Sequence, residues 1–183
     1  MTKKRSAIWF VIAVFVTAIF MMIRAQASNI QPASSEEAAA GWISFKDKES
    51  AEEVAGMIIY SPGTINGAAE SVYAAMPGGA VKVIYQKDGN DSVILQKSLT
   101  AGTQPTSSEE KLYTGRLGLT NVSYQGDNTN IHFISWSEAD EEGQPVYYTV
   151  QVLQDGFSIE DAGNLVNLLS ETALNGAVQE IGQ

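Results

Sequence analysis

Residues 80–98, AVKVIYQKDGNDSVILQKS, carry the pattern that decides the fold. Valine, isoleucine, leucine and tyrosine dominate both halves of this stretch, and β-branched and aromatic residues favour strands. Because successive side chains of a strand point to opposite faces, Val81, Val83 and Tyr85 are expected on one face of a sheet. Asp88-Gly89 separates the halves and supplies the positive φ that a tight hairpin needs. The stretch therefore predicts a β-hairpin.

The same signals continue on both sides of this hairpin. Residues 71–76 are followed by Pro77-Gly78-Gly79 and predict a preceding strand, which completes a three-stranded meander. Further strand patterns, separated by polar turns, lie at 58–60, 117–124, 131–137 and 146–153. Strands joined by short turns pair antiparallel.

Two helices are expected beside these strands. Ser50 and Glu53 have the spacing of a capping box, and Gly56 is expected to end this short helix. A second helix is expected to begin after Ser158, with Asp161 at its third position. Its apolar residues recur at helical spacing and predict one face for the sheet: Ile159, Ala162, Leu165, Val166 and Leu169. The predicted fold class is α+β, a curved antiparallel sheet of six to seven strands with a short N-terminal helix and a C-terminal amphipathic helix.

The amino end predicts export. Lys3-Lys4-Arg5 precedes Ala7–Ile23, a run in which Thr17 is the only polar residue. Such a run partitions into lipid while the basic cluster stays on the cytoplasmic side. Ala25-Gln26-Ala27 has the small-x-small pattern of a signal-peptidase site. Two alternatives follow: a signal peptide cleaved after Ala27, or an uncleaved anchor that crosses the membrane through residues 7–23.

The domain boundaries follow from these patterns. Residues 1–27 are expected to be the signal peptide or signal anchor, and residues 28–40, which are polar and small, a flexible tether. Residues 41–173 are expected to form one extracytoplasmic α+β domain, and residues 174–183 a tail. The predicted location is the cell membrane with an extracytoplasmic C-terminal domain, or the secreted fraction after cleavage.

Composition and charge exclude several classes of protein. The net charge is −10, and four of the 11 basic residues precede residue 28. Phosphate binding needs clustered Lys and Arg, so nucleic acid is not expected as a partner. The chain has no cysteine, which excludes disulfides and zinc-thiolate sites.

The residues that usually carry catalysis do not form a recognisable set. His132 is the single histidine, and neither a G-x-S-x-G serine elbow nor a glycine-rich nucleotide loop is present. Glu138, Asp140 and their neighbours lie in a polar loop, where solvation keeps carboxylates ionised. We therefore assign no catalytic, cofactor-binding or metal-binding residue and expect no enzymatic activity.

Aromatic residues on alternate strands are the remaining candidates. Core packing is their ordinary role, but on a curved sheet they would also line an apolar groove for a lipid tail or an extended peptide. The candidate groove residues are Tyr73, Tyr85, Phe133, Trp136 and Tyr147.

The order of these elements resembles a known family. It is carried by the turn at 60–63 (Tyr-Ser-Pro-Gly), the meander, the strand that contains Trp136-Ser137, and the helix after Ser158. Over residues 41–173 the chain is similar to a bacterial family of unknown function, the extracytoplasmic domains at the C-terminal ends of anti-sigma-factor-like membrane proteins. That family supplies no catalytic residues. Its zinc-binding regulatory segment has no counterpart before Ser6, so direct binding of a sigma factor is not expected. More loosely, the layout resembles the half-barrel domains of periplasmic lipoprotein carriers.

Three functions remain open at this stage. The first is a non-enzymatic binding or sensing module of the bacterial cell envelope, with an envelope protein, peptide or lipid as its ligand. The alternative is a half-barrel carrier of a lipid or another apolar ligand. The third is a hydrolase of envelope material that uses Glu138 and Asp140.

Overall fold

The computed structural model describes residues 30–31, 40–101, 111–140 and 142–170. The elements, in chain order, are β1 (Ile30–Gln31), β2 (Ile43–Phe45), α3 (Lys48–Ala55), β3 (Thr64–Ile65), β4 (Ala68–Met76), β5 (Ala80–Lys87), β6 (Asn90–Ser98), β7 (Leu112–Leu117), β8 (Thr120–Asp127), β9 (Asn130–Ala139), β10 (Pro145–Val152) and α4 (Ile159–Leu169). The apolar stretch 7–23 and the tail 174–183 lie outside the described residues.

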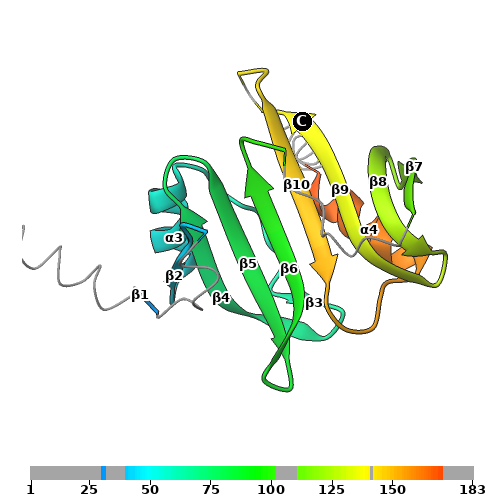
Figure 1. Ribbon diagram of the computed structural model, residues 1–183, viewed down its shortest axis with the longest axis horizontal. Helices are drawn as coiled ribbons and strands as arrows, with labels where there is room; N and C mark the ends of the chain where they lie inside the picture. Colours follow the sequence, from blue (N-terminus) through cyan, green and yellow to red (C-terminus); the bar gives the residue numbers. More distant parts are fainter. Residues whose placement is uncertain (1–29, 32–39, 102–110, 141, 171–183) are drawn as a thin grey trace, which may run out of the picture.

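All strands belong to one curved antiparallel sheet (Figure 1). Its order is β1-β2-β4-β5-β6-β10-β9-β8-β7, with β3 paired to β4, which makes ten strands in the described part of the chain. The α+β class with one early and one C-terminal helix is confirmed. The sheet is larger than the six to seven strands expected, because β1, β2 and β3 are too short to show a periodic pattern and β7 was not recognised as a strand separate from β8.

The carboxyl half of the sheet contains a hairpin that the sequence pattern did not reveal. A single strand was expected over 117–124, but Gly118 (φ 59°) turns the chain between β7 and β8. Apolar Leu117 and Leu119 on either side of this glycine imitate a continuous strand. The expected strand at 58–60 is absent as well. Ile59 is buried there as a loop residue, while Ile58 is exposed.

Both helices cover the same face of the sheet, which we call the covered face. Helix α3 packs on β2, β4 and β5, and α4 packs on β7, β8 and β9; both lie behind the sheet in Figure 1. The central apolar row of this face runs across four strands in register: Val83, Leu95, Val150 and Ile134. Each is fully buried, so this face holds the main hydrophobic core, which also contains Val81 and Tyr85 as expected.

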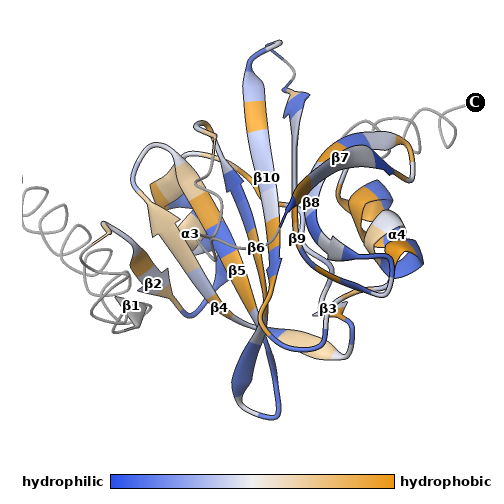
Figure 2. Cartoon of the chain, turned by 45° about the vertical axis from the view of Figure 1, so that its right-hand side comes forward, coloured by the Kyte–Doolittle hydropathy of each residue, from blue (hydrophilic) through white to orange (hydrophobic). Residues whose placement is uncertain are grey.

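The opposite face, which we call the open face, is mostly polar. One continuous cross-strand row on it consists of Lys82, Gln96, Thr149, Ser135, Ser123 and Thr114. Four buried apolar side chains also lie on this face, outside the main core cluster: Ala74, Ala80, Ile84 and Phe133. Figure 2 shows the resulting alternation of hydrophilic and hydrophobic bands along β10.

The ends of the helices follow local rules. Asp47, not Ser50, caps α3: its carboxylate accepts a hydrogen bond from the Ser50 N–H at 2.9 Å. Gly56 ends the helix in the left-handed conformation (φ 70°), as expected. Ser158 caps α4 and accepts from the Asp161 N–H, which confirms the expected start. In the part of the chain that the structure describes, no helix combines the length and apolar character needed to cross a membrane.

The turn at Gly118 gives a testable prediction. A Cβ at this position would overlap the side chain of Asn167 on α4 and would also be strained by the positive φ. Gly143, in the β9–β10 turn, is the matched control. Its φ is likewise positive (78°), but no atom lies within 4 Å of a Cβ added there. Gly143→Ala should therefore lower the free energy of unfolding by about 1 kcal/mol, the cost of the backbone conformation alone. Gly118→Ala should cost clearly more in urea unfolding, and equal costs would show that Asn167 does not pack against this turn.

Candidate functional site

Strands β8 and β9 pair along only part of their lengths. Their register runs from Asp127↔Asn130 to Ser123↔Ser135. Beyond it, residues 120–122 of β8 remain paired to β7, and residues 136–139 of β9 remain paired to β10. Two strand segments thus face each other within the sheet with no ladder recorded between them, and Figure 1 shows the strands diverging here. We call this opening the β8–β9 gap and the two segments its arms.

The end of α4 contacts the β7–β8 turn and the β9 arm of the gap. On the β8 side, Asn167 Oδ1 accepts a hydrogen bond from the N–H of Leu119 at 2.8 Å. On the β9 side, the hydroxyl of Ser170 donates to Glu138 Oε1 at 2.6 Å. Trp136 Nε1 donates to the same carboxylate oxygen at 3.2 Å. The helix therefore connects the β7–β8 turn to β9 at the end of the sheet where β8 and β9 no longer pair.

A hollow lies on each side of the sheet at this gap. The open-face hollow has a volume of about 750 Å³ and is lined by Ala101, Thr114, Gly115, Arg116, Asn121, Val122, Ser123, Ser135, Trp136, Ser137, Tyr147, Tyr148 and Thr149. The α4-side hollow, of about 410 Å³, is lined by Leu119, Thr120, Ser137, Glu138, Ala139, Asn167 and Ser170. Ser137 lines both, and each hollow contains residues from both arms of the gap.

The open-face hollow mixes polar and apolar groups and carries little charge. By strand parity, the side chains that point into it include a row of hydroxyls, those of Thr114, Ser123, Ser135 and Thr149. A hydroxyl both donates and accepts hydrogen bonds. Arg116 is the one charged side chain among the described residues that line it. This lining can bind a polar ligand, but it has no carboxylate or histidine for general acid–base chemistry.

The five aromatic candidates do not come together. Tyr73, Tyr85 and Trp136 point to the covered face, whereas Phe133 and Tyr147 point to the open face. Tyr85 is fully buried and Phe133 is 3% exposed. Trp136 stacks on Tyr148 with ring centroids 5.0 Å apart. Of the five, only Trp136 and Tyr147 line the open-face hollow, and Tyr147, which is half-buried, is the one whose side chain faces into it.

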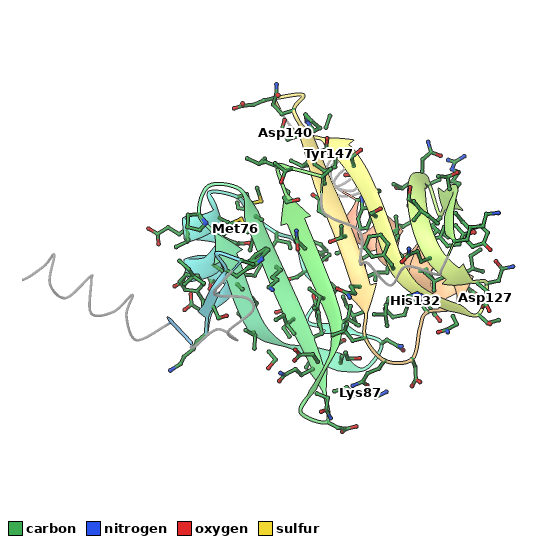
Figure 3. All side chains as sticks on the ribbon, in the orientation of Figure 1. Met76, Lys87, Asp127, His132, Asp140 and Tyr147 are labelled. Atoms are coloured by element: carbon green, nitrogen blue, oxygen red, sulfur yellow. The ribbon has the colours of Figure 1, made fainter. Side chains whose placement is uncertain are left out.

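The carboxylates and the histidine singled out in the sequence lie elsewhere or have structural partners. Asp140 Oδ1 accepts from the N–H groups of Glu142 at 3.0 Å and Gln144 at 2.7 Å, which shapes the β9–β10 turn. Glu138 binds Trp136 and Ser170, as described above. Half-buried His132 lies at the other end of the sheet from Tyr147 (Figure 3). No group of three or more metal-ligating side chains occurs within the described ranges.

Sequence reasoning missed the residues that define the gap. Arg116 and Asn121 flank a turn that was expected to be continuous strand. The sequence therefore did not predict that they pair with each other across a hairpin. Asn167 and Ser170 lie on the polar side and at the end of the predicted helix, where polar residues are ordinary. The end of pairing between two strands leaves no local signal in the sequence. Residues 120–122 still pair with β7 and residues 136–139 still pair with β10, so both arms keep the residue pattern of a strand.

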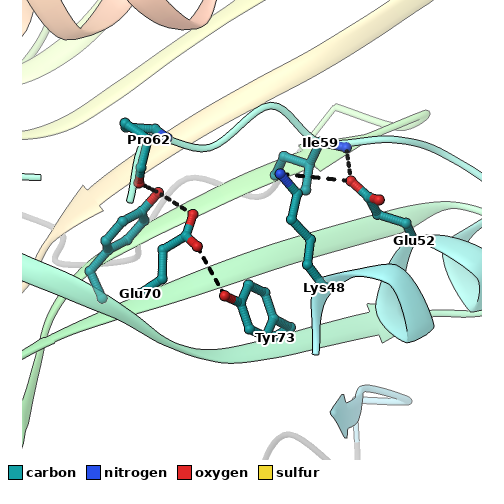
Figure 4. Close-up of polar contacts among 7 residues, drawn as sticks. Lys48, Glu52, Ile59, Pro62, Glu70 and Tyr73 are labelled. Carbon is teal, nitrogen blue, oxygen red and sulfur yellow. Dashed lines mark hydrogen bonds and ion pairs between the residues drawn. The ribbon is translucent and has the colours of Figure 1, made fainter. Parts of the chain in front are cut away.

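A second polar cluster joins the turn before β3 to β4 and β5 (Figure 4). The hydroxyl of Tyr73 donates to Glu70 Oε2 at 2.9 Å, and that of Tyr85 donates to the carbonyl oxygen of Pro62 at 2.9 Å. Burial, together with the hydrogen bond to Glu70 and its negative charge, raises the pKa of Tyr73 to about 12. Burial and the Glu70 carboxylate also raise the pKa of Tyr85. The cluster stabilises the fold and is separate from the gap.

Comparisons of the chain with known protein families, with curated proteins and with solved structures give no match. The resemblance to the extracytoplasmic domains of anti-sigma-factor-like proteins therefore stays a prediction. The candidate site rests on its own geometry.

The raised pKa of Tyr73 predicts a loss of stability at high pH. The unfolded chain releases this proton near pH 10, its ordinary value, whereas the folded protein holds it to about pH 12. The stabilisation is complete below pH 10 and is lost as the pH rises toward 12. The free energy of unfolding should fall across this window, and less steeply in Tyr73→Phe. Glu70→Gln should lower the pKa of Tyr73 in a phenolate absorbance titration, and an unchanged titration would contradict the role of Glu70.

Proposed function

We propose that this chain is an exported or membrane-anchored, non-enzymatic binding module of the bacterial cell envelope, and that the β8–β9 gap with its open-face hollow is its binding site. The supporting observation is an opening within the sheet that α4 borders, with hydrogen bonds to the β7–β8 turn and to β9, and whose lining spans four strands. Strand pairing would ordinarily close such a space. A ligand is a physical reason for it to stay open.

The composition of the hollow supports binding over catalysis. Ligand sites use a few polar groups in fixed positions to set orientation and specificity. The hollow offers hydroxyls, the Asn121 amide, the Arg116 guanidinium and the Tyr147 ring on rigid strands. Catalysis of hydrolysis would need an acid and a base within reach of one bond. Glu138 and Asp140, the carboxylates of the hydrolase hypothesis, are engaged in contacts that hold the local fold.

The same lining bears on the alternative of a lipid carrier. The wall combines aromatic rings with a row of hydroxyls and the Arg116 guanidinium. An acyl chain would contact the rings, but the hydroxyls and the guanidinium would lose hydrogen bonds to water without replacement. The aromatic residues that would have lined an apolar groove are mainly in the core. The hollow therefore favours a polar ligand.

The proposed location rests on the amino end and on charge. Residues 7–23 are proposed to enter the membrane, with Lys3-Lys4-Arg5 retained on the cytoplasmic side. The domain then faces outward, and the same holds if the chain is released after Ala27. Its net negative charge disfavours anionic lipid heads as the ligand.

Binding at the hollow is tested with the full chain in detergent, immobilised and titrated with the solubilised envelope fraction of the cells that make it. We expect saturable retention of a specific component. The double variant Arg116→Ala, Tyr147→Ala should weaken that retention at least tenfold, because both side chains point into the hollow. Lys87→Ala, at the exposed end of β5, is the control and should change nothing. Equal retention by both variants would remove the hollow as the site.

The orientation is tested with single cysteines, since the chain has none of its own. Exposed Ser71 on β4 is replaced in Ser71→Cys, and Thr2, which the proposal leaves in the cytoplasm, in Thr2→Cys. A membrane-impermeant maleimide added to intact cells should label Ser71→Cys and spare Thr2→Cys until lysis. If Ser71→Cys is also spared in intact cells, the domain is cytoplasmic and the proposed location is wrong.

A further inference from the structure

We propose that the ligand of the β8–β9 gap is an extended peptide, inserted as a strand between β8 and β9. This inference rests on the proposed function and specifies the class of ligand. Three features of the gap carry it: the strand edges that face it, the hollows on both sides of the sheet, and the charges in those hollows.

The arms present strand edges to the gap. A strand directs its backbone N–H and C=O groups alternately to its two neighbours. In residues 120–122 the groups on one side pair with β7, and in residues 136–139 the groups on one side pair with β10. The groups on the other side of each arm point into the gap, where an extended peptide can pair with them. Because β8 and β9 are antiparallel, such a peptide runs antiparallel to one arm and parallel to the other.

The hollows match the side chains of an inserted strand. Successive side chains of a strand point to opposite faces of the sheet. The gap has a hollow of about 750 Å³ on the open face and one of about 410 Å³ on the α4 side. Alternate residues of the peptide would occupy these two spaces in turn. A ligand bound to the open face alone would leave the α4-side hollow unexplained.

The charges of the hollows predict a sequence preference. Exposed Arg116 lines the open-face hollow, where no acidic residue is among the described lining. Glu138 lines the α4-side hollow. Peptide residues that point to the open face should therefore be acidic or hydroxylated, and those that point toward α4 basic or neutral, so that opposite charges meet. The preferred peptide alternates these two classes.

The first test uses a display library of random twelve-residue peptides against the full chain in detergent. We expect enrichment of peptides with the alternating pattern. Bound peptide should slow hydrogen exchange at least tenfold for those amides in residues 120–122 and 136–139 that point into the gap. Methylation of single backbone nitrogens in the middle of the peptide should weaken binding at least tenfold at both odd and even positions, because both sides of an inserted strand pair. If methylation weakens binding only at odd or only at even positions, the peptide pairs along one side alone. Such a result would indicate a strand added to the outer edge of β7 and would overturn insertion.

Two charge variants check the orientation. Arg116→Glu should shift the selected residues on the open-face side from acidic to basic, while Lys87→Glu, remote from the gap, should leave the selection unchanged. A selection that is identical for the parent and Arg116→Glu would overturn the assignment.

Soluble glycan fragments of the envelope are the alternative probe. If they bind with Arg116 dependence while no peptide is enriched, the hollow is a binding site but its ligand is not a peptide. If neither probe binds and the envelope fraction yields no saturable component, the proposed function fails with it.

Discussion

Two hydrogen bonds at the end of α4 connect this helix to the unusual half of the sheet. Asn167 holds the β7–β8 turn through the N–H of Leu119, and Ser170 holds β9 through Glu138. A helix that packs on a sheet through apolar side chains alone leaves neighbouring strands free to pair. Here its polar side chains also bind the β7–β8 turn and β9, beside the segments where β8 and β9 are not paired. The buried side chains of Leu165, Val166 and Leu169 pack α4 against the covered face of the sheet. This packing keeps the helix in place beside the β8–β9 gap.

The two halves of the sheet differ in how they use this arrangement. Around α3, strands β4, β5 and β6 pair over most of their lengths, and the Glu70 cluster ties the preceding turn to them. Around α4, the pairing of β8 with β9 ends at Ser123↔Ser135, and the polar row of the open face crosses from β9 to β8 at this last pair. The half of the sheet around α3 is therefore held by ordinary core packing. The half around α4 combines a rigid frame with exposed polar and backbone groups, an arrangement that suits a binding site.

The sequence predicted much of the frame and little of the site. The meander over 71–98, both helices and their ends at Gly56 and Ser158 follow from local rules of alternation, turns and caps. The hairpin at Gly118 was missed because leucines flank the glycine. The site was missed for a different reason: it depends on where a long-range helix contact stops a strand ladder, and no single segment records that event. The aromatic residues were a poor guide, since a large ring fills a core as readily as it lines a groove.

The central claim is that β8 and β9 part beyond Ser123 and Ser135, and cysteine pairs measure this directly. A disulfide needs Cα atoms within about 7 Å. The paired positions Ser123 and Ser135 and the next positions of the same parity, Asn121 and Ser137, differ only in whether they lie before or within the gap. In a chain with no native cysteine, the pair Ser123→Cys, Ser135→Cys should oxidise readily, whereas Asn121→Cys, Ser137→Cys should remain reduced under the same conditions. Equal oxidation of the two pairs would mean that the strands close, and that no gap exists to bind a ligand.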